Sequence, residues 1–410
     1  MDRFRIVGPT RITGRVEVAG AKNAALPALA ASLLTTDTVE LSRLPQVRDI
    51  RTMQALLQHL GVEIELANDH VRLRPTDRLQ TDDAPYELVK TMRASVLVLQ
   101  HLAGLEALGA QVELDHGYVT ARARQLVGAR YRFATATVTG TENMIMASVL
   151  ARGASVLENC AREPEIIDLS NLLNAMGARI SGAGSEVIEV EGVQELGGAR
   201  HRIISDRIEA GTYLIAAAIT AGDLTVDGAD KTHLAPLLEK LDESGCELEL
   251  DDDAITLRRS DELRPRDLVT APYPGFPTDL QAQYMALMTQ AVGHSTVCET
   301  VFENRFQHVS ELTRMGADIH IEGSFARVHG PASLSGATVM ATDLRASASL
   351  VLAGLAAAGE TIIDRIYHLD RGYEQMEIKL QQLGARVQRI ESRTAAGDEN
   401  RARERAEERR

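Results

Sequence analysis

An internal repeat constrains the fold of this chain more than any other feature of its sequence. An amphipathic helix pattern, a glycine and a short alternating strand pattern follow one another six times, with the glycines at Gly61, Gly109, Gly177, Gly245, Gly316 and Gly384. A glycine after the last periodic residue is a common helix C-cap, and the alternation that follows is typical of a strand. Because a second helix pattern, rich in small residues, precedes each unit, we infer six βαβαββ-like repeats up to about residue 390.

The second repeat is shorter than the others. Five repeats have 34 to 38 residues between the start of the small-residue helix and the capping glycine. In the second repeat, Ser95 and Gly109 are separated by only 14 residues. We infer that this repeat lacks its middle strand and the loops that flank it.

The alternation of helix and strand patterns predicts an α/β fold, classed in some schemes as α+β. Three repeats lie on each side of Ile204, so we expect two globules, one of residues 22–204 and one of residues 1–21 together with 205–390. The tail, residues 391–410, contains six acidic and six basic residues and almost no large apolar ones. A segment of this composition is expected to be disordered.

Charge and composition exclude several classes of function. The net charge is −14, aromatic residues make up 3% and tryptophan is absent, which argues against nucleic acid or an anionic membrane as a partner. Three widely spaced cysteines indicate neither a disulfide framework nor a thiolate zinc site. No signal peptide is evident, and the apolar run at 346–359 is too short to span a bilayer, so we expect a cytoplasmic, soluble protein.

Four cationic residues lie at or near predicted helix starts in this acidic chain. Lys22 begins the first small-residue helix, Arg93 and Arg345 occupy related places in repeats two and six, and Arg371 is expected to open the last helix. A cation at a helix start opposes the helix dipole, whereas an anion bound there is stabilised by it. The four together favour an anion site, although each alone is compatible with a solvated side chain.

Several carboxylates have two readings. Asp279 is either a helix N-cap or a general base, and Asp343 has the same ambiguity. Glu163 lies before a proline at a predicted helix start, where carboxylates are common for structural reasons. The cysteines Cys160, Cys246 and Cys298 lie in or beside apolar strand patterns and are expected to be small core residues.

Seven phrases of the sequence are distinctive: GAKNAALP, KTMRAS, ENCAREPEI, PTDLQAQ, TVFENRFQHV, ATDLRASASLVLAG and DRIYHLDRGYE. Together they resemble the enolpyruvyl transferases that act on UDP-N-acetylglucosamine, and the resemblance extends from residue 1 to about 391. It implies two inside-out α/β barrels of three repeats each, with helices at the centre, sheets outside and a cleft that closes on substrate. It also implies a monomer that needs no cofactor and no metal.

The reaction implied by the resemblance transfers the enolpyruvyl group of phosphoenolpyruvate to the 3-hydroxyl of UDP-N-acetylglucosamine and releases phosphate. This is the first committed step in making peptidoglycan precursors. By resemblance, Lys22 holds phosphate and Asn23 lies near the sugar nucleotide. The guanidiniums of Arg93, Arg345 and Arg371 are expected to clamp phosphoenolpyruvate, with Lys22 and Arg371 also placed among the catalytic residues.

The resemblance assigns Asp279 as the base that orients and deprotonates the sugar hydroxyl. A further set of matching residues is expected to line the cleft: Thr135, Ala136, Thr137, Val138, Glu163, Val301, Phe302, Arg305, Asp343 and Leu344. Family members often carry a lysine where this chain has Thr135, so one phosphate contact differs.

The family carries a glycine-rich segment where Gln100 and His101 adjoin in this chain. That segment bears the cysteine that protonates C3 of phosphoenolpyruvate and reacts with fosfomycin, and an arginine that reaches the substrate phosphates. Its absence predicts impaired turnover, because losing one catalytic acid costs about 10²–10⁴-fold in rate. Three readings stay open: an enzyme of this family, a paralogue that binds the sugar nucleotide without turning it over, and a deletion variant.

Overall fold

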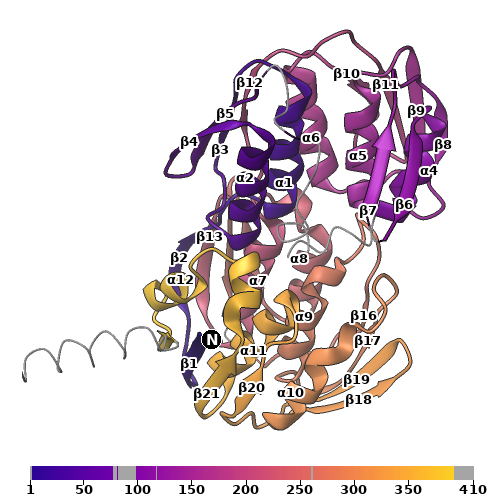
Figure 1. The fold of residues 1–410 in the computed structure, drawn as a ribbon. Helices are drawn as coiled ribbons and strands as arrows, with labels where there is room; N and C mark the ends of the chain where they lie inside the picture. Colours follow the sequence, from indigo (N-terminus) through magenta and orange to yellow (C-terminus); the bar gives the residue numbers. More distant parts are fainter. Residues whose placement is uncertain (1, 77–80, 82–97, 117, 260–261, 392–410) are drawn as a thin grey trace, which may run out of the picture.

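The computed structural model describes residues 2–76, 81, 98–116, 118–259 and 262–391. Arg93 and most of the tail, from residue 392 onward, lie outside the described residues. The described part forms an upper region, coloured indigo to magenta, and a lower region, coloured rose to yellow, with the N-terminal strand β1 in the lower one (Figure 1).

Five four-stranded sheets and one two-stranded sheet are present in the described part of the chain. The first region holds β12 (Ala199–Arg202), β3 (Val39–Ser42), β5 (His70–Arg74) and β4 (Glu63–Ala67) in one sheet, and β10 (Arg179–Ser181), β11 (Val187–Glu191), β9 (Ala154–Glu158) and β8 (Arg130–Arg132) in another. The two-stranded sheet consists of β6 (Gln111–Asp115) and β7 (Tyr118–Arg122).

The second region contains three sheets of four strands. Their strands, in spatial order, are β14 (Glu247–Leu250), β15 (Ala254–Arg258), β13 (Asp223–Asp227) and β2 (Thr13–Glu17); β16 (Leu268–Val269), β17 (Gly293–Cys298), β19 (Phe325–Gly330) and β18 (Asp318–Glu322); and β20 (Thr338–Met340), β21 (Gly359–Asp364), β1 (Arg3–Gly8) and β22 (Val387–Ile390).

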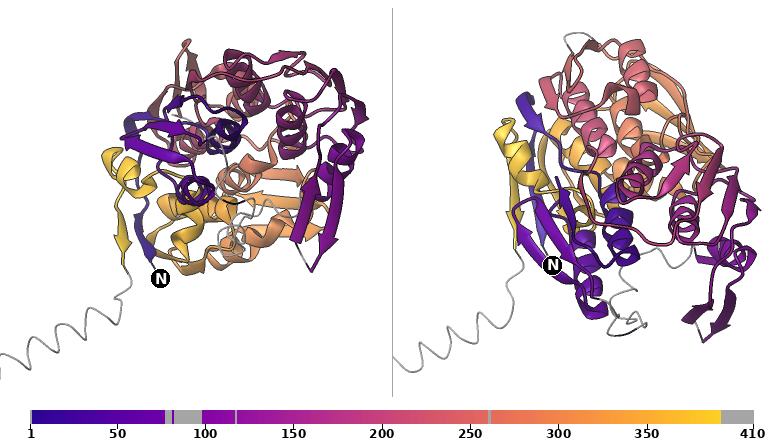
Figure 2. Two further views of the ribbon diagram at one scale, coloured as in Figure 1. Left: turned by 45° about the horizontal axis from the view of Figure 1, so that its top comes forward. Right: turned by 90° about the horizontal axis from the view of Figure 1, so that it is seen from above.

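Each four-stranded sheet has the same plan, namely three strands paired antiparallel and one parallel strand at an edge. The parallel edge pairs are β12 with β3, β8 with β9, β2 with β13, β16 with β17 and β20 with β21. Among the described residues, the strands of the second repeat are those of the β6–β7 hairpin, which lies at the periphery in the further views (Figure 2). The short spacing predicts that this repeat lacks a middle strand, and the part of the repeat that the structure describes contains none.

Helices of the first region are α1 (Lys22–Ala31), α2 (Arg48–Leu60), α4 (Val98–Ala107), α5 (Val138–Ser148) and α6 (Pro164–Ala175), with the 3-10 turn η1 (Ser32–Leu34). Helices of the second are α7 (Arg207–Ile219), α8 (Ala235–Glu243), α9 (Gln281–Met288), α10 (Val309–Arg314), α11 (Leu344–Ala356) and α12 (Met376–Gln382). The second region also contains the 3-10 turns η3 (Lys231–His233), η4 (Thr278–Leu280), η5 (Arg305–His308) and η6 (Ile366–Arg371).

The six repeat glycines have the conformation that the sequence predicts. Each has a positive φ, between 89° and 104°. At Gly61, for example, the backbone N–H donates to the carbonyl of Gln58, which closes the last turn of α2. A side chain at such a position would be strained, so glycine ends the second helix of every repeat.

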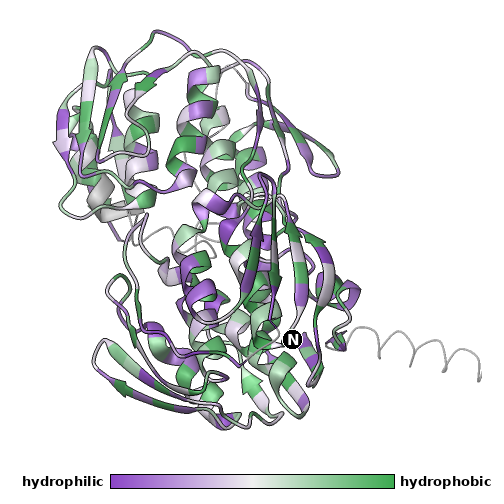
Figure 3. Ribbon diagram, turned by 180° about the vertical axis from the view of Figure 1, so that it is seen from behind, coloured by the Kyte–Doolittle hydropathy of each residue, from purple (hydrophilic) through white to green (hydrophobic). Residues whose placement is uncertain are grey.

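Two hydrophobic clusters fill the interior. The first core runs from Ala21 to Ile203, and the second core combines residues 4–18 with residues 208–387. The small-residue helices α7, α9 and α11 are buried along almost their whole length and pack together inside the second core. Hydrophobic residues occur in both regions when the ribbon is coloured by hydropathy (Figure 3). We propose that the two cores correspond to two domains, 22–204 and 1–21 with 205–390.

The chain passes between the cores at two adjacent points. The N–H of Ala21 donates to the carbonyl of Ile204 at 2.7 Å, and Gly20 forms a bridge with Ser205. A Cβ on Gly20 would lie 1.8 Å from the carbonyl oxygen of Arg43, so only glycine fits there. Because Lys22 follows directly, this crossing sets the position of the N-terminus of α1.

Candidate functional site

A polar pocket of 240 Å³ lies where the N-terminus of α1 meets η4, η5, η6 and α11. Its lining comes from both cores: Lys22, Asn23, Asp279, Phe302, Asn304, Arg305, Gln307, Asp343, Leu344, Arg345, His368 and Arg371. The structure thus brings together three of the four cations singled out in the sequence. Nothing is described of the fourth, Arg93.

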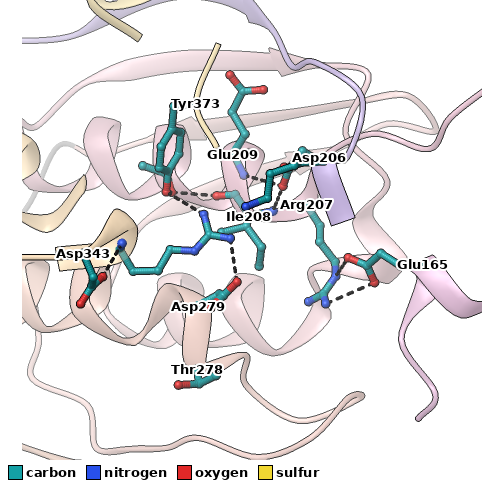
Figure 4. Close-up of polar contacts among 12 residues, drawn as sticks. Glu165, Asp206, Arg207, Ile208, Glu209, Thr278, Asp279, Asp343 and Tyr373 are labelled. Carbon is teal, nitrogen blue, oxygen red and sulfur yellow. Dashed lines mark hydrogen bonds and ion pairs between the residues drawn. The ribbon is translucent and has the colours of Figure 1, made fainter. Parts of the chain in front are cut away.

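Asp279 lies between two guanidiniums in this pocket, and Figure 4 shows the contact of one of them with its carboxylate. Its Oδ1 accepts a hydrogen bond from Arg305 Nη2 at 2.7 Å, and its Oδ2 accepts one from Arg345 Nη2 at 2.6 Å. Burial would raise the pKa of Asp279, but the charges of Arg345 and Arg305 outweigh it and hold the pKa well below its usual range. The carboxylate is therefore ionised and fully engaged, and it makes no helix-capping hydrogen bond.

Arg345 is held from both of its ends. At the start of α11, Asp343 accepts hydrogen bonds from the backbone N–H groups of Arg345 and Ala346, so its side chain is an N-cap. At the other end, Arg345 Nη1 donates to the hydroxyl of Tyr373 at 3.4 Å, and that hydroxyl also contacts Thr212 at 2.9 Å. A guanidinium fixed in this way presents a planar donor face to the pocket.

Lys22 and Arg371 share one buried carboxylate, Asp49 of α2. Lys22 Nζ lies 3.2 Å from Asp49 Oδ2, while Arg371 donates from Nε at 3.0 Å and from Nη2 at 3.2 Å. Burial lowers the pKa of Lys22, and the charge of Asp49 opposes that fall. The prediction that Arg371 opens the last helix is wrong, because Arg371 is the last residue of η6. Its guanidinium is oriented by the bidentate pair with Asp49 rather than by a helix dipole.

A second pocket, of 780 Å³, adjoins the polar one. The two share Phe302, Asn304, Arg305 and Gln307 among their lining residues. Val301 and Phe302 line the larger pocket and are 44% and 50% exposed, and Arg305 lies over the Phe302 ring at 4.9 Å. A large cavity with exposed apolar surface is thus continuous with a small cationic one.

Other residues picked from the sequence lie away from these pockets. Thr135 to Val138 lead into α5, where Thr137 is the N-cap and accepts a hydrogen bond from the N–H of Gly140. Glu163 directly precedes α6, and its carboxylate accepts a hydrogen bond from the backbone N–H of Arg162. None of these lines either pocket in the described part of the chain.

Two charged residues, Asp49 and Arg207, were not predicted from the sequence, and Glu165 was expected to be a structural carboxylate at a helix start. Asp49 has the appearance of an ordinary first-turn acid of α2, and its partners lie far away in the sequence. Arg207 and Glu165 form an ion pair between the two cores at 3.1 Å (Figure 4), although both look like helix-start residues. No local signal in the sequence distinguishes these side chains from solvated ones.

The three cysteines lie outside both pockets. Burial raises the pKa of the Cys160 thiol and of the Cys246 thiol to about 12, so neither forms a thiolate readily. The described residues contain no group of three histidines, cysteines or carboxylates that could hold a metal ion. None of their helices is long and apolar enough to cross a membrane.

Known proteins match the chain along almost its whole length. A family model described as EPSP synthase (3-phosphoshikimate 1-carboxyvinyltransferase) matches residues 6–104 and 98–380. UDP-N-acetylglucosamine 1-carboxyvinyltransferase of Koribacter versatilis (strain Ellin345) is 52% identical, covering 95% of this chain and 97% of the relative. The protein of that name from Solibacter usitatus (strain Ellin6076) is 51% identical, covering 95% and 100%.

Solved structures share the fold. The enolpyruvyl transferase NikO from Streptomyces tendae superposes with a TM-score of 0.87 at 23% identity, over 95% of this chain and 99% of that one. EPSP synthase from Acinetobacter baumannii gives a TM-score of 0.73 at 16% identity, over 95% and 100%. At these identities the likeness concerns the fold alone, and it agrees with the α/β architecture predicted from the repeats.

The alignment with the Koribacter protein is 419 residues long, which exceeds the 410 residues of this chain. The relative therefore has residues without a counterpart here, as the short second repeat predicts, and their placement between Gln100 and His101 stays a prediction. With a family model across most of its length and relatives above 50% identity, the chain belongs to the EPSP synthase family of enolpyruvyl transferases.

Proposed function

We propose that this chain binds phosphoenolpyruvate and UDP-N-acetylglucosamine in the cleft between its two cores and transfers the enolpyruvyl group to the 3-hydroxyl of the sugar. The observation that carries the proposal is the convergence of cations from both cores on one pocket, in a chain 52% identical to a protein named for this activity. The product would be a precursor of peptidoglycan.

The charge of the pocket suits a small polyanion. Lys22, Arg305, Arg345 and Arg371 supply four positive charges, and the carboxylates around them are those of Asp279, Asp49 and Asp343. An anion with a phosphate and a carboxylate would offset the excess of positive charge. Planar guanidiniums bind such groups through two parallel hydrogen bonds, and Lys22 adds a point charge.

The base role of Asp279 follows from what anion binding would do to its partners. In the present arrangement both carboxylate oxygens accept hydrogen bonds from guanidiniums, which makes Asp279 a poor proton acceptor. An anion that draws Arg345 toward itself would free Oδ2 and raise the pKa of Asp279. The base would then be available only when phosphoenolpyruvate is bound.

The sugar nucleotide would bind in the larger pocket. Its shared lining with the cationic pocket would put a sugar hydroxyl next to bound phosphoenolpyruvate. The exposed side chains of Val301 and Phe302 offer apolar surface to the sugar. Substrate positioning of this kind supplies much of the rate enhancement in a two-substrate reaction.

The chemistry balances as an addition followed by an elimination. The sugar oxygen bonds to C2 of phosphoenolpyruvate, its proton passes to Asp279, and C3 takes a proton from an acid. The C2–O bond to phosphate then breaks, and C3 loses a proton to restore the double bond. The proton transfer to C3 needs an acid, and no thiol of this chain lies in the pocket to supply it, since the three cysteines lie elsewhere. That observation favours the second candidate, a paralogue that binds the sugar nucleotide without turnover.

A phosphate-release assay with both substrates, combined with calorimetric titration of UDP-N-acetylglucosamine, tests the proposal. Arg345→Gln should abolish phosphoenolpyruvate-dependent release, whereas Arg327→Gln, an exposed arginine on β19, serves as the matched control. Release by the unaltered chain that depends on both substrates supports the enzyme. Binding of the sugar nucleotide without release supports the paralogue, and the absence of both would contradict either function.

A rescue distinguishes a lost acid from a degenerate cleft. The glycine-rich, cysteine-bearing segment of the family is inserted between Gln100 and His101, and phosphate release and fosfomycin labelling are measured with and without it. We expect labelling only in the inserted form, because alkylation needs an accessible thiolate. Equal turnover by the two forms would show that the cysteine is dispensable here.

A further inference from the structure

Asp49 joins two cations that belong to different cores. It lies in the first turn of α2 in the first core, and its side chain is only 8% exposed. One of its oxygens is shared between Lys22 Nζ and Arg371 Nη2, each at 3.2 Å, and the other accepts from Arg371 Nε at 3.0 Å. Lys22 follows the crossing between the cores, whereas Arg371 comes from η6 of the second core.

An ordinary structural role does not account for this arrangement. A carboxylate in the first turn of a helix is often present because the helix dipole favours it. Asp49, however, directs its oxygens at the two cations, and α2 has no side-chain cap. A second contact docks the same segments, since the backbone N–H of Gln46 donates to Glu374 at 3.0 Å.

We propose that Asp49 is a positioning residue for anion binding, which draws Arg371 of the second core against Lys22 of the first so that both face one bound anion. The inference deepens the proposed function and takes from it only that the ligand is an anion. Asp49 itself contacts no reacting atom. It acts through the two cations and holds the cleft together before the anion arrives.

The charges around Lys22 show why this carboxylate matters to it. Burial lowers the pKa of Lys22, and Asp49 opposes this more strongly than any other group. The nearby charge of Arg345 lowers the pKa further, and Asp279 raises it again. The guanidinium of Arg371, held on the same carboxylate, adds another positive charge. Without Asp49, Lys22 would lose its proton at a lower pH.

Replacement of Asp49 by asparagine separates two explanations by the sign of the effect. If Asp49 only neutralises positive charge, Asp49→Asn leaves the pocket more positive and the variant binds anions more tightly. If Asp49 positions the cations, the variant binds them more weakly, because Arg371 is no longer tied to Lys22 and Lys22 is more easily deprotonated. The two explanations predict opposite changes in affinity.

The experiment is calorimetric titration of the whole chain with inorganic phosphate and with phosphoenolpyruvate, between about pH 6 and pH 9. We expect Asp49→Asn to bind both at least about tenfold more weakly, as when one partner of a buried charge pair is removed. We also expect the anion affinity of this variant to fall at a lower pH than that of the unaltered chain. Asp49→Glu, which keeps the charge, should return the pH at which affinity falls to that of the unaltered chain.

The matched control is Glu40→Gln. Glu40 lies on β3 of the same core, and its carboxylate pairs with Arg72 and Arg200. This variant should leave phosphate affinity unchanged. Equal or tighter binding by Asp49→Asn, or an unchanged pH dependence, would overturn the inference, as would a failure of the unaltered chain to bind phosphate. A failure to bind UDP-N-acetylglucosamine, by contrast, would contradict the proposed function and leave the role of Asp49 standing.

Discussion

Glu142 is a buried acid whose protonation should make the stability of this chain depend on pH. It lies in α5, is 5% exposed, and its Oε1 has no hydrogen-bond partner among the described residues. Burial, together with the negative charges of Glu165 and Glu163, raises its pKa from 4.5 to about 8. The folded state therefore keeps Glu142 neutral at pH values where the unfolded chain ionises it.

The sign and size of the effect follow from this difference in pKa. Between pH 4.5 and about pH 8 the folded state binds more protons than the unfolded state, so the free energy of unfolding falls as the pH rises. Each pKa unit corresponds to about 1.4 kcal/mol, so the loss across this range is on the order of 5 kcal/mol. Glu142→Gln keeps the shape but cannot ionise, which should remove this loss.

Urea unfolding of the two proteins at about pH 5, 7 and 9 measures the effect. We expect the glutamine variant to gain stability relative to the unaltered chain at each step toward alkaline pH, with the largest gain at the highest pH. Glu189→Gln, at an exposed position on β11, is the matched control and should follow the unaltered chain. Parallel pH profiles for the unaltered chain and Glu142→Gln would refute the reasoning.

Three further substitutions test other parts of the structure. Asp279→Asn should lower phosphate release by about 10²–10⁴-fold in any form of the chain that turns over, while UDP-N-acetylglucosamine binding by calorimetry is retained; undiminished release would remove Asp279 from the base role. Gly20→Ala should cost about 1–3 kcal/mol or more in urea unfolding, because its Cβ would collide with the Arg43 carbonyl, and wild-type stability would contradict this. Burial lowers the pKa of His308 from 6.5 to about 4, so stability should fall as the pH drops through that window. His308→Gln should reduce this acid-induced loss of stability in thermal unfolding. The same loss in both proteins would contradict a buried neutral imidazole.

The repeat plan of the fold was predictable from the sequence. Helix periodicity, a capping glycine and strand alternation are set by neighbours within a few residues, and all six capping glycines have the expected positive φ. In the described part of the chain, the shortened second repeat has a two-stranded sheet where the other repeats have four-stranded sheets. The sequence is compatible with either a helix N-cap or a general base at Asp343, and the structure shows an N-cap.

The arrangement of charges was not predictable in the same way. Asp49 and Arg371 are 322 positions apart and meet only because η6 docks on the start of α2. The sequence pattern predicts Arg371 at a helix start, which is wrong, and no local pattern indicates that Asp49, Glu142 or Arg207 is buried. The repeats and their caps could be inferred from the amino-acid sequence because they depend on local backbone geometry. Which cation meets which carboxylate depends on the folded chain, because burial and Coulomb energy are set by distances between segments that local patterns do not encode.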